Sequence, residues 1–83
     1  MSVHHYMVDY EDADGKVQFA SATYLYGLAE AKALARTVSK KHGSAAVVAY
    51  EQDGFVLGAS TFLPVGHVMF SGGKQSDIDG VVA

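Results

Sequence analysis

The sequence contains no cysteine, no tryptophan and a single proline, and only 18% of its 83 residues are charged. Without cysteine the chain cannot form a disulfide, a thiolate metal site or a thiol nucleophile. Ordinary soluble domains carry about 25% charged residues, and a chain this small has a large surface relative to its volume. Since 49% of the residues are hydrophobic, we expect some apolar surface to be exposed or covered by a partner.

The sequence also lacks segments that direct a chain into or across a membrane. No stretch approaches the roughly twenty apolar residues of a membrane span, and the first residues have neither the basic start nor the apolar run of a secretory signal. We therefore expect one cytoplasmic domain over residues 1–71, a flexible polar and glycine-rich tail over 72–83, and no membrane partner.

A helix is the clearest element of the chain. Apolar residues recur at three- to four-residue spacing from Leu28 to Val38, which lines one side of an α-helix. Basic residues crowd the end of this segment, where the helix dipole favours cations, and Gly43 supplies the left-handed residue that ends it. The pattern predicts a helix over Leu28–His42, with Gly27 at its start.

Two strand–turn–strand segments flank this helix. Residues 3–25 alternate in polarity on both sides of the turn sequence 11–15, which predicts a first hairpin. After the helix, the sequence predicts an apolar strand over 45–50, a turn over 51–54 and a partner strand over 55–63. A short fifth strand is expected over 67–70. The expected fold is α+β, with two β-hairpins flanking one helix (ββαββ) and the helix packed on one face of a mainly antiparallel sheet.

The strand over 45–50 is apolar on both of its faces, since Val47 and Val48 point in opposite directions. One helix of about four turns covers one face of such a sheet. We expect a second copy of the chain to cover the other face, because most soluble oligomers are symmetric dimers. Val48 and Val56 are the candidate residues of this homodimer face. Folding back of the tail is the alternative cover.

The sequence has no motif for binding a metal or a phosphate. Its histidines lack the spacing that places two on one helix face, and the neighbours His4 and His5 point to opposite sides of a strand. The acidic turn has Tyr10 and Ser21 where a calcium loop needs its first ligand and its closing glutamate. P-loop, dinucleotide and nucleophile-elbow motifs are missing. We expect no metal, no cofactor and no enzyme activity, although a Ser–His–Asp set could assemble from distant positions.

A basic row on the helix is a candidate nucleic-acid site. Lys32, Arg36 and Lys40 stand four residues apart and therefore form one row on the helix surface, with Lys41 beside it. Together with the tyrosines, this row could bind a nucleic acid weakly. The formal net charge of −3 opposes binding to a polyanion. Nucleic-acid binding is therefore the second candidate function.

Protein binding is the function that the sequence favours. Tyrosine offers a large contact area at small entropic cost, and acidic residues steer association. In size, acidity and expected fold, the chain resembles inhibitors carried by phages and mobile elements, which implies a small non-enzymatic inhibitor or regulator. The identity of the protein partner stays open. The candidate contact residues are Glu11, Asp12, Asp14, Tyr24, Tyr26 and Tyr50.

Overall fold

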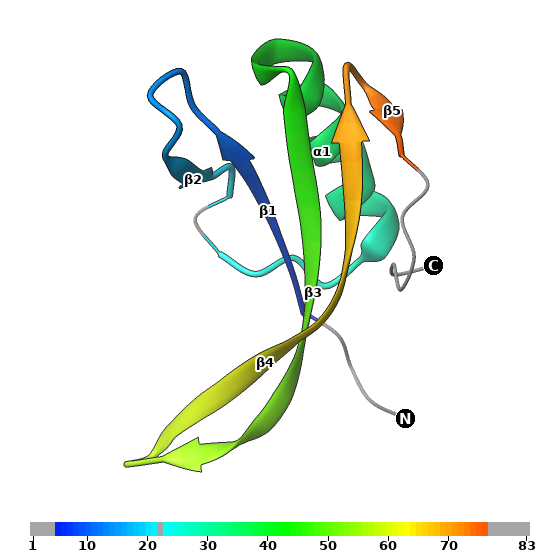
Figure 1. Ribbon diagram of the computed structural model, residues 1–83. Helices are drawn as coiled ribbons and strands as arrows, with labels where there is room; N and C mark the ends of the chain where they lie inside the picture. Colours follow the sequence, from blue (N-terminus) through cyan, green and yellow to red (C-terminus); the bar gives the residue numbers. More distant parts are fainter. Residues whose placement is uncertain (1–4, 22, 77–83) are drawn as a thin grey trace.

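In the computed structural model, one helix lies against one face of a five-stranded sheet (Figure 1). The structure describes residues 5–21 and 23–76, except for the side chains of residues 55 and 56. Neighbouring strands are antiparallel, in the order β2-β1-β3-β4-β5. This confirms the predicted α+β class. The elements are β1 His5–Glu11, β2 Val17–Phe19, α1 Leu28–His42, β3 Ser44–Val56, β4 Ala59–Ser71 and β5 Lys74–Gln75.

The helix α1 begins and ends where the sequence predicts. Gly27 precedes it in an extended conformation, and its carbonyl accepts a hydrogen bond of 3.0 Å from the Ala31 amide. Gly43 ends the helix with a φ of 97°, a value that favours glycine because it has no Cβ. Within the described residues, no helix has the length and apolarity needed to cross a bilayer.

The core lies between α1 and the sheet. Val8, Val47 and Val68 form a fully buried row across β1, β3 and β4, because the strand register places them side by side. Burial of each such side chain contributes about 1.5–3 kcal/mol. Alanines on the helix let α1 approach the sheet closely. The core cluster is Tyr6, Val8, Ala31, Ala35, Ala45, Val47, Ala49, Val68 and Phe70.

Strands β3 and β4 are longer than predicted, and the turn between them lies elsewhere. The predicted turn over 51–54 is wrong, because Asp53 is accommodated as an unpaired bulge residue and pairing continues to Val56. The chain turns at Leu57 and Gly58, whose φ values of 54° and 82° are both positive, as in a type I′ hairpin turn. The outer part of this hairpin, residues 50–65, forms an arm that swings away from the sheet (Figure 1).

The fifth strand also differs from the prediction. Residues 67–70 continue β4, because Pro64 lies next to a second register shift and does not end the strand. The fifth strand is instead β5, which follows a turn at Gly72 and Gly73 and lies in the segment predicted as the start of the tail. Residues 77–83 of that predicted tail lie outside the described residues.

Candidate protein-binding face

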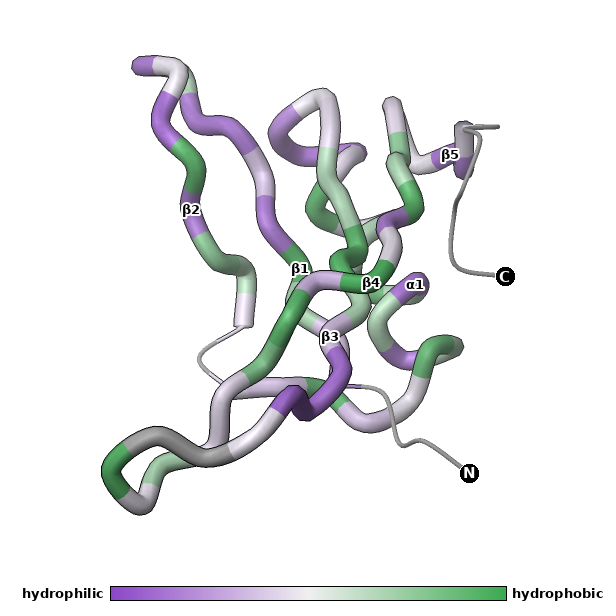
Figure 2. Tube along the Cα trace, turned by 60° about the horizontal axis from the view of Figure 1, so that its bottom comes forward, coloured by the Kyte–Doolittle hydropathy of each residue, from purple (hydrophilic) through white to green (hydrophobic). Residues whose placement is uncertain are grey.

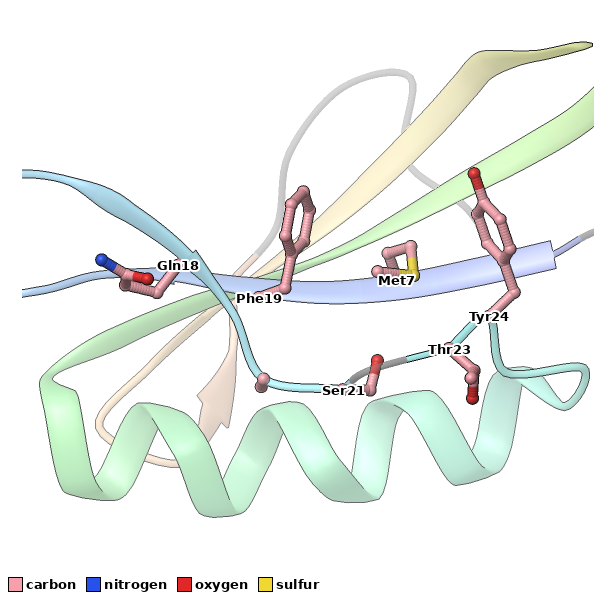
Figure 3. Close-up of a pocket in the computed structure, with 7 residues that line it drawn as sticks. Met7, Gln18, Phe19, Ser21, Thr23 and Tyr24 are labelled. Atoms are coloured by element: carbon pink, nitrogen blue, oxygen red, sulfur yellow. The ribbon is translucent and has the colours of Figure 1, made fainter.

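The candidate site is the face of the sheet opposite α1, which we call the open face. Side chains alternate along a strand, so the neighbours of the buried residues point away from the helix. Figure 3 shows this orientation for Met7, Phe19 and Tyr24. Within the described residues, no helix or strand covers this face (Figure 1). The face carries Met7, Asp9 and Glu11 from β1, Val17 and Phe19 from β2, and Ala46, Val48, His67 and Met69 from β3 and β4.

The predicted dimer residues are partly placed by this arrangement. Val48 lies at the middle of the open face, between Met7 on β1 and His67 on β4, and its side chain is half-buried. Val56 ends β3 at the tip of the arm, far along the strand from Val48, and its side chain lies outside the described part of the chain. The structure therefore places Val48 on the open face and does not describe the side chain of Val56.

A hollow of about 800 Å³ lies on the open face beside β2 (Figure 3). Phe19 borders it and is 63% exposed, which is unusual for a phenylalanine. The described lining carries no carboxylate, imidazole or amine, so it offers apolar contact and small hydroxyl and amide groups. The Ser21 hydroxyl is buried there without a hydrogen-bond partner in the structure. The lining residues are Met7, Gln18, Phe19, Ala20, Ser21, Thr23 and Tyr24.

An aromatic cluster adjoins the hollow. The ring of His5 makes edge contacts with Tyr24, Tyr26 and Phe62, at centroid distances of 5.7, 5.1 and 4.9 Å. Tyr24 also lies 5.8 Å from Tyr50 and 5.2 Å from Phe62. Such ring pairs contribute about 0.5–1.5 kcal/mol each. The three tyrosines predicted as protein contacts are thus brought together, with Tyr26 70% exposed.

The chain between β2 and α1 positions these tyrosines. Leu25 pairs with Tyr6 at the edge of β1, with two backbone hydrogen bonds of 2.8 Å. This bridge turns Leu25 toward the core, so its neighbours Tyr24 and Tyr26 lie on the open face. Sequence reasoning missed His5 and Phe62 as members of the cluster. The alternation of side chains along β1 could have assigned His5 to this face, whereas Phe62 can be assigned to the cluster only when the register of the arm is known.

Asp9 is the carboxylate within the apolar part of the open face. Burial raises the pKa of Asp9 above its usual range, and the nearby imidazole of His67 opposes this shift in part. Burial also raises the pKa of Tyr50, with smaller contributions from the charge of Asp9 and from Tyr24. These shifts indicate that water is partly excluded from the face even in the free chain.

The acidic turn lies at the other end of β1 from the aromatic cluster. The carboxylate of Asp12 is engaged within the turn, where it accepts hydrogen bonds of 2.9 Å from the amides of Asp14 and Lys16 and one of 3.0 Å from Gln18. The hydrogen bonds from Lys16 and Gln18 lower the pKa of Asp12. Its role is to close the hairpin. Glu11 and Asp14 remain exposed.

The basic row of the helix lies on the opposite side of the sheet from the tyrosines of the open face. The Arg36 guanidinium carbon lies 5.5 Å from the centroid of the Phe70 ring, and a Cβ on Gly73 would lie 2.5 Å from Lys40 Cε. Lys32 is half-buried, while Lys41 is exposed. Arg36 and Lys40 are exposed, and their side chains also pack beside Phe70 and Gly73 at the flank of the core.

Among the described residues, no three histidine, aspartate or glutamate side chains lie close enough together to hold a metal ion. No protein-family model matches the chain, and neither the curated proteins nor the solved structures contain a significant match to it.

Proposed function

We propose that the chain is a non-enzymatic protein-binding module, of the inhibitor or regulator kind, that binds its partner through the open face of its sheet. The observation that carries this proposal is the combination of an apolar face, a hollow and an aromatic cluster on the side of the sheet away from α1. Interface cores are depleted in charge and enriched in aromatic residues and methionine. The open face is rich in methionine and aromatic residues, with Asp9 and His67 as the ionisable groups of its central rows.

The hollow and the aromatic cluster have complementary roles in this proposal. The hollow can accept an apolar side chain, and Phe19 and Tyr24 at its rim would become buried against that side chain. Tyr26 adds a hydroxyl that can hydrogen bond at the edge of the contact. Glu11, exposed at the end of the face beside Val17, and Asp14, exposed in the turn, would steer a basic partner toward the face without forming the centre of the contact.

Nucleic-acid binding has less support. Base stacking on Tyr24 and Tyr26 and phosphate contact by Arg36 would have to occur together, and these residues lie on opposite sides of the sheet. A strand of nucleic acid would have to pass around the edge of the domain to reach both sets. The net charge of −3 opposes that path.

The proposal is tested with a matched pair of charge insertions. Phe19→Lys places a charge at the rim of the hollow, and Ala33→Lys places the same charge on the exposed side of α1. Proteins retained by the wild-type chain from cells of its source are identified, and the complex is rebuilt from purified components. Phe19→Lys should weaken the rebuilt complex at least about tenfold, while Ala33→Lys should change it less than about twofold.

Two results would contradict the proposal. One is a rebuilt complex whose affinity is the same with Phe19→Lys as with the wild-type chain. The other is a wild-type chain that neither retains a protein above the background of unloaded resin nor associates with itself. Circular dichroism of each variant controls for loss of the fold, since Phe19 belongs to a short edge strand and not to the core.

A further inference from the structure

We infer that the partner of the open face is a second copy of this chain, with the two sheets packed face to face about a twofold axis that runs along β3. This inference rests on the proposed function, because it names the partner of the same face. It concerns the central strands β1, β3 and β4, whose outward rows are Met7–Val48–His67 and Asp9–Ala46–Met69.

The ionisable groups of these rows make the face complementary to itself. Asp9 lies on β1 and His67 on β4, so they stand on opposite sides of β3 in adjacent rows. A twofold axis along β3 places β1 of one copy over β4 of the other, so the acid of each copy lies over Met69 of its mate and diagonally opposite the imidazole, one row further along the strand. An axis across the strands would place β1 over β1 and bring acid toward acid, which is unfavourable in an apolar interface.

A contact between Asp9 of one copy and His67 of the other also agrees with the electrostatics of the single chain. His67 already lies close enough to Asp9 to lower its pKa against the effect of burial. In the twofold arrangement each carboxylate would lie between two imidazoles, one from each copy. Of the other ionisable groups on this side, Tyr50 lies on β3 beyond Val48 and the charge of Asp9 contributes to its raised pKa, while His5 and Glu11 belong to the ends of β1.

The size of the face is adequate for a weak to moderate dimer. Three central strands, each about 4.8 Å wide, over the seven residues of β1 at about 3.3 Å each give a face of roughly 14 Å by 23 Å, and the short edge strands β2 and β5 add three and two residues to this face. Side-chain relief makes the accessible area larger than this plan area, so two such faces would bury on the order of 1,000 Å². Stable protein interfaces begin at about this size.

The first experiment measures mass against concentration by sedimentation equilibrium, from about 1 µM to about 100 µM. The wild-type chain should approach twice its mass of 8.8 kDa. Val48→Lys, at the centre of the face, should stay monomeric, and Ala33→Lys should behave as the wild type. Phe19→Lys, outside the core, gives a second weakened dimer in case Val48→Lys does not fold.

The second experiment tests the axis with a pair of charge changes. Asp9→Lys should weaken the dimer at least about tenfold because it removes the carboxylate that meets the imidazole of the mate and leaves an ammonium group in the interface, and His67→Asp should do the same because it brings two carboxylates together. An equimolar mixture of the two variants should form a mixed dimer, because the introduced lysine faces the introduced aspartate while Asp9 faces His67 at the second contact. Native mass spectrometry measures the amounts of the two homodimers and of the mixed dimer.

Each result has a definite meaning. A wild-type chain that stays monomeric over the whole range overturns the inference, and if its open face still captures another protein, the proposed function survives. A dimer that is unchanged by both Val48→Lys and Phe19→Lys has its interface elsewhere, which overturns the inference. Failure of the mixture to dimerise, with both variants folded, overturns the axis along β3.

Discussion

Ser39 connects α1 to the turn between β4 and β5, and its removal gives the sharpest prediction on stability. Its side chain is 0% exposed. The hydroxyl donates a hydrogen bond of 3.0 Å to the Arg36 carbonyl and accepts one of 2.8 Å from the amide of Gly73, which lies 34 residues away in the sequence. Ser39→Ala removes this acceptor without changing the course of the helix.

The expected loss follows from the Gly73 amide, which becomes a partly buried donor without a partner. Leaving such a group unsatisfied costs about 1–3 kcal/mol. Alanine has a higher helix propensity than serine by roughly half a kcal/mol, which offsets part of the loss. The free energy of unfolding should therefore fall by about 1–2 kcal/mol, and Tm should fall by about 4–16 °C for a domain of this size.

Urea unfolding at one fixed protein concentration measures this loss, with far-UV circular dichroism as the signal. Thr37→Ala is the matched control, because its hydroxyl donates to the Ala33 carbonyl at 3.3 Å on the exposed side of the same helix. The control should change stability by less than about 0.5 kcal/mol. If Ser39→Ala proves as stable as Thr37→Ala, the bond to Gly73 does not contribute as argued.

Three further predictions concern the arm, the open face and the basic row. Leu57 is fully exposed with a φ of 54°, a backbone conformation that asparagine adopts more readily than leucine. Leu57→Asn should therefore stabilise the arm by up to about 1 kcal/mol and slow its amide exchange. Faster exchange would argue against strain in the turn. Because burial raises the pKa of Asp9, the wild-type chain should lose stability as pH rises through that pKa. Asp9→Asn should therefore be the more stable form at pH 7 in urea unfolding, with its advantage gone below the usual value of 3.8. Arg36→Glu should lower thermal stability by about 0.5–1 kcal/mol, and Arg36→Lys by less, because the guanidinium lies over Phe70.

The helix could be predicted from the sequence because its signals are local and agree. The apolar spacing, the basic last turn and Gly43 all indicate the same boundaries. The arm could not be predicted, because its turn uses Leu57 where a type I′ turn normally has asparagine or glycine. Asp53 and Gly54 form a stronger local turn sequence than Leu57 and Gly58. Because β3 pairs with β4 on both sides of Asp53, that residue forms a bulge and not a turn.

The sequence indicates several residues of the candidate site but not how they are arranged in space. Tyr24, Tyr26 and Tyr50 stand out as aromatic residues near the ends of elements, but Phe62 joins them only after the bulges have set the register of the arm. Tyr24 and Tyr26 lie on the open face because the bridge between Tyr6 and Leu25 fixes the orientation of this segment. Long-range pairing of this kind leaves no local pattern in the sequence.

The distribution of apolar volume supports association as the role of the open face. Hydrophobic residues lie along β2 and at the tip of the arm as well as in the core (Figure 2). The mostly exposed side chains on the open face are Val17, Phe19 and Tyr26. At about 25 cal/mol per Å², the surface that these residues leave in water contributes nothing to folding of a single chain. The same surface becomes favourable when a second face covers it, so this chain carries its largest unused hydrophobic stabilisation where a partner can bind.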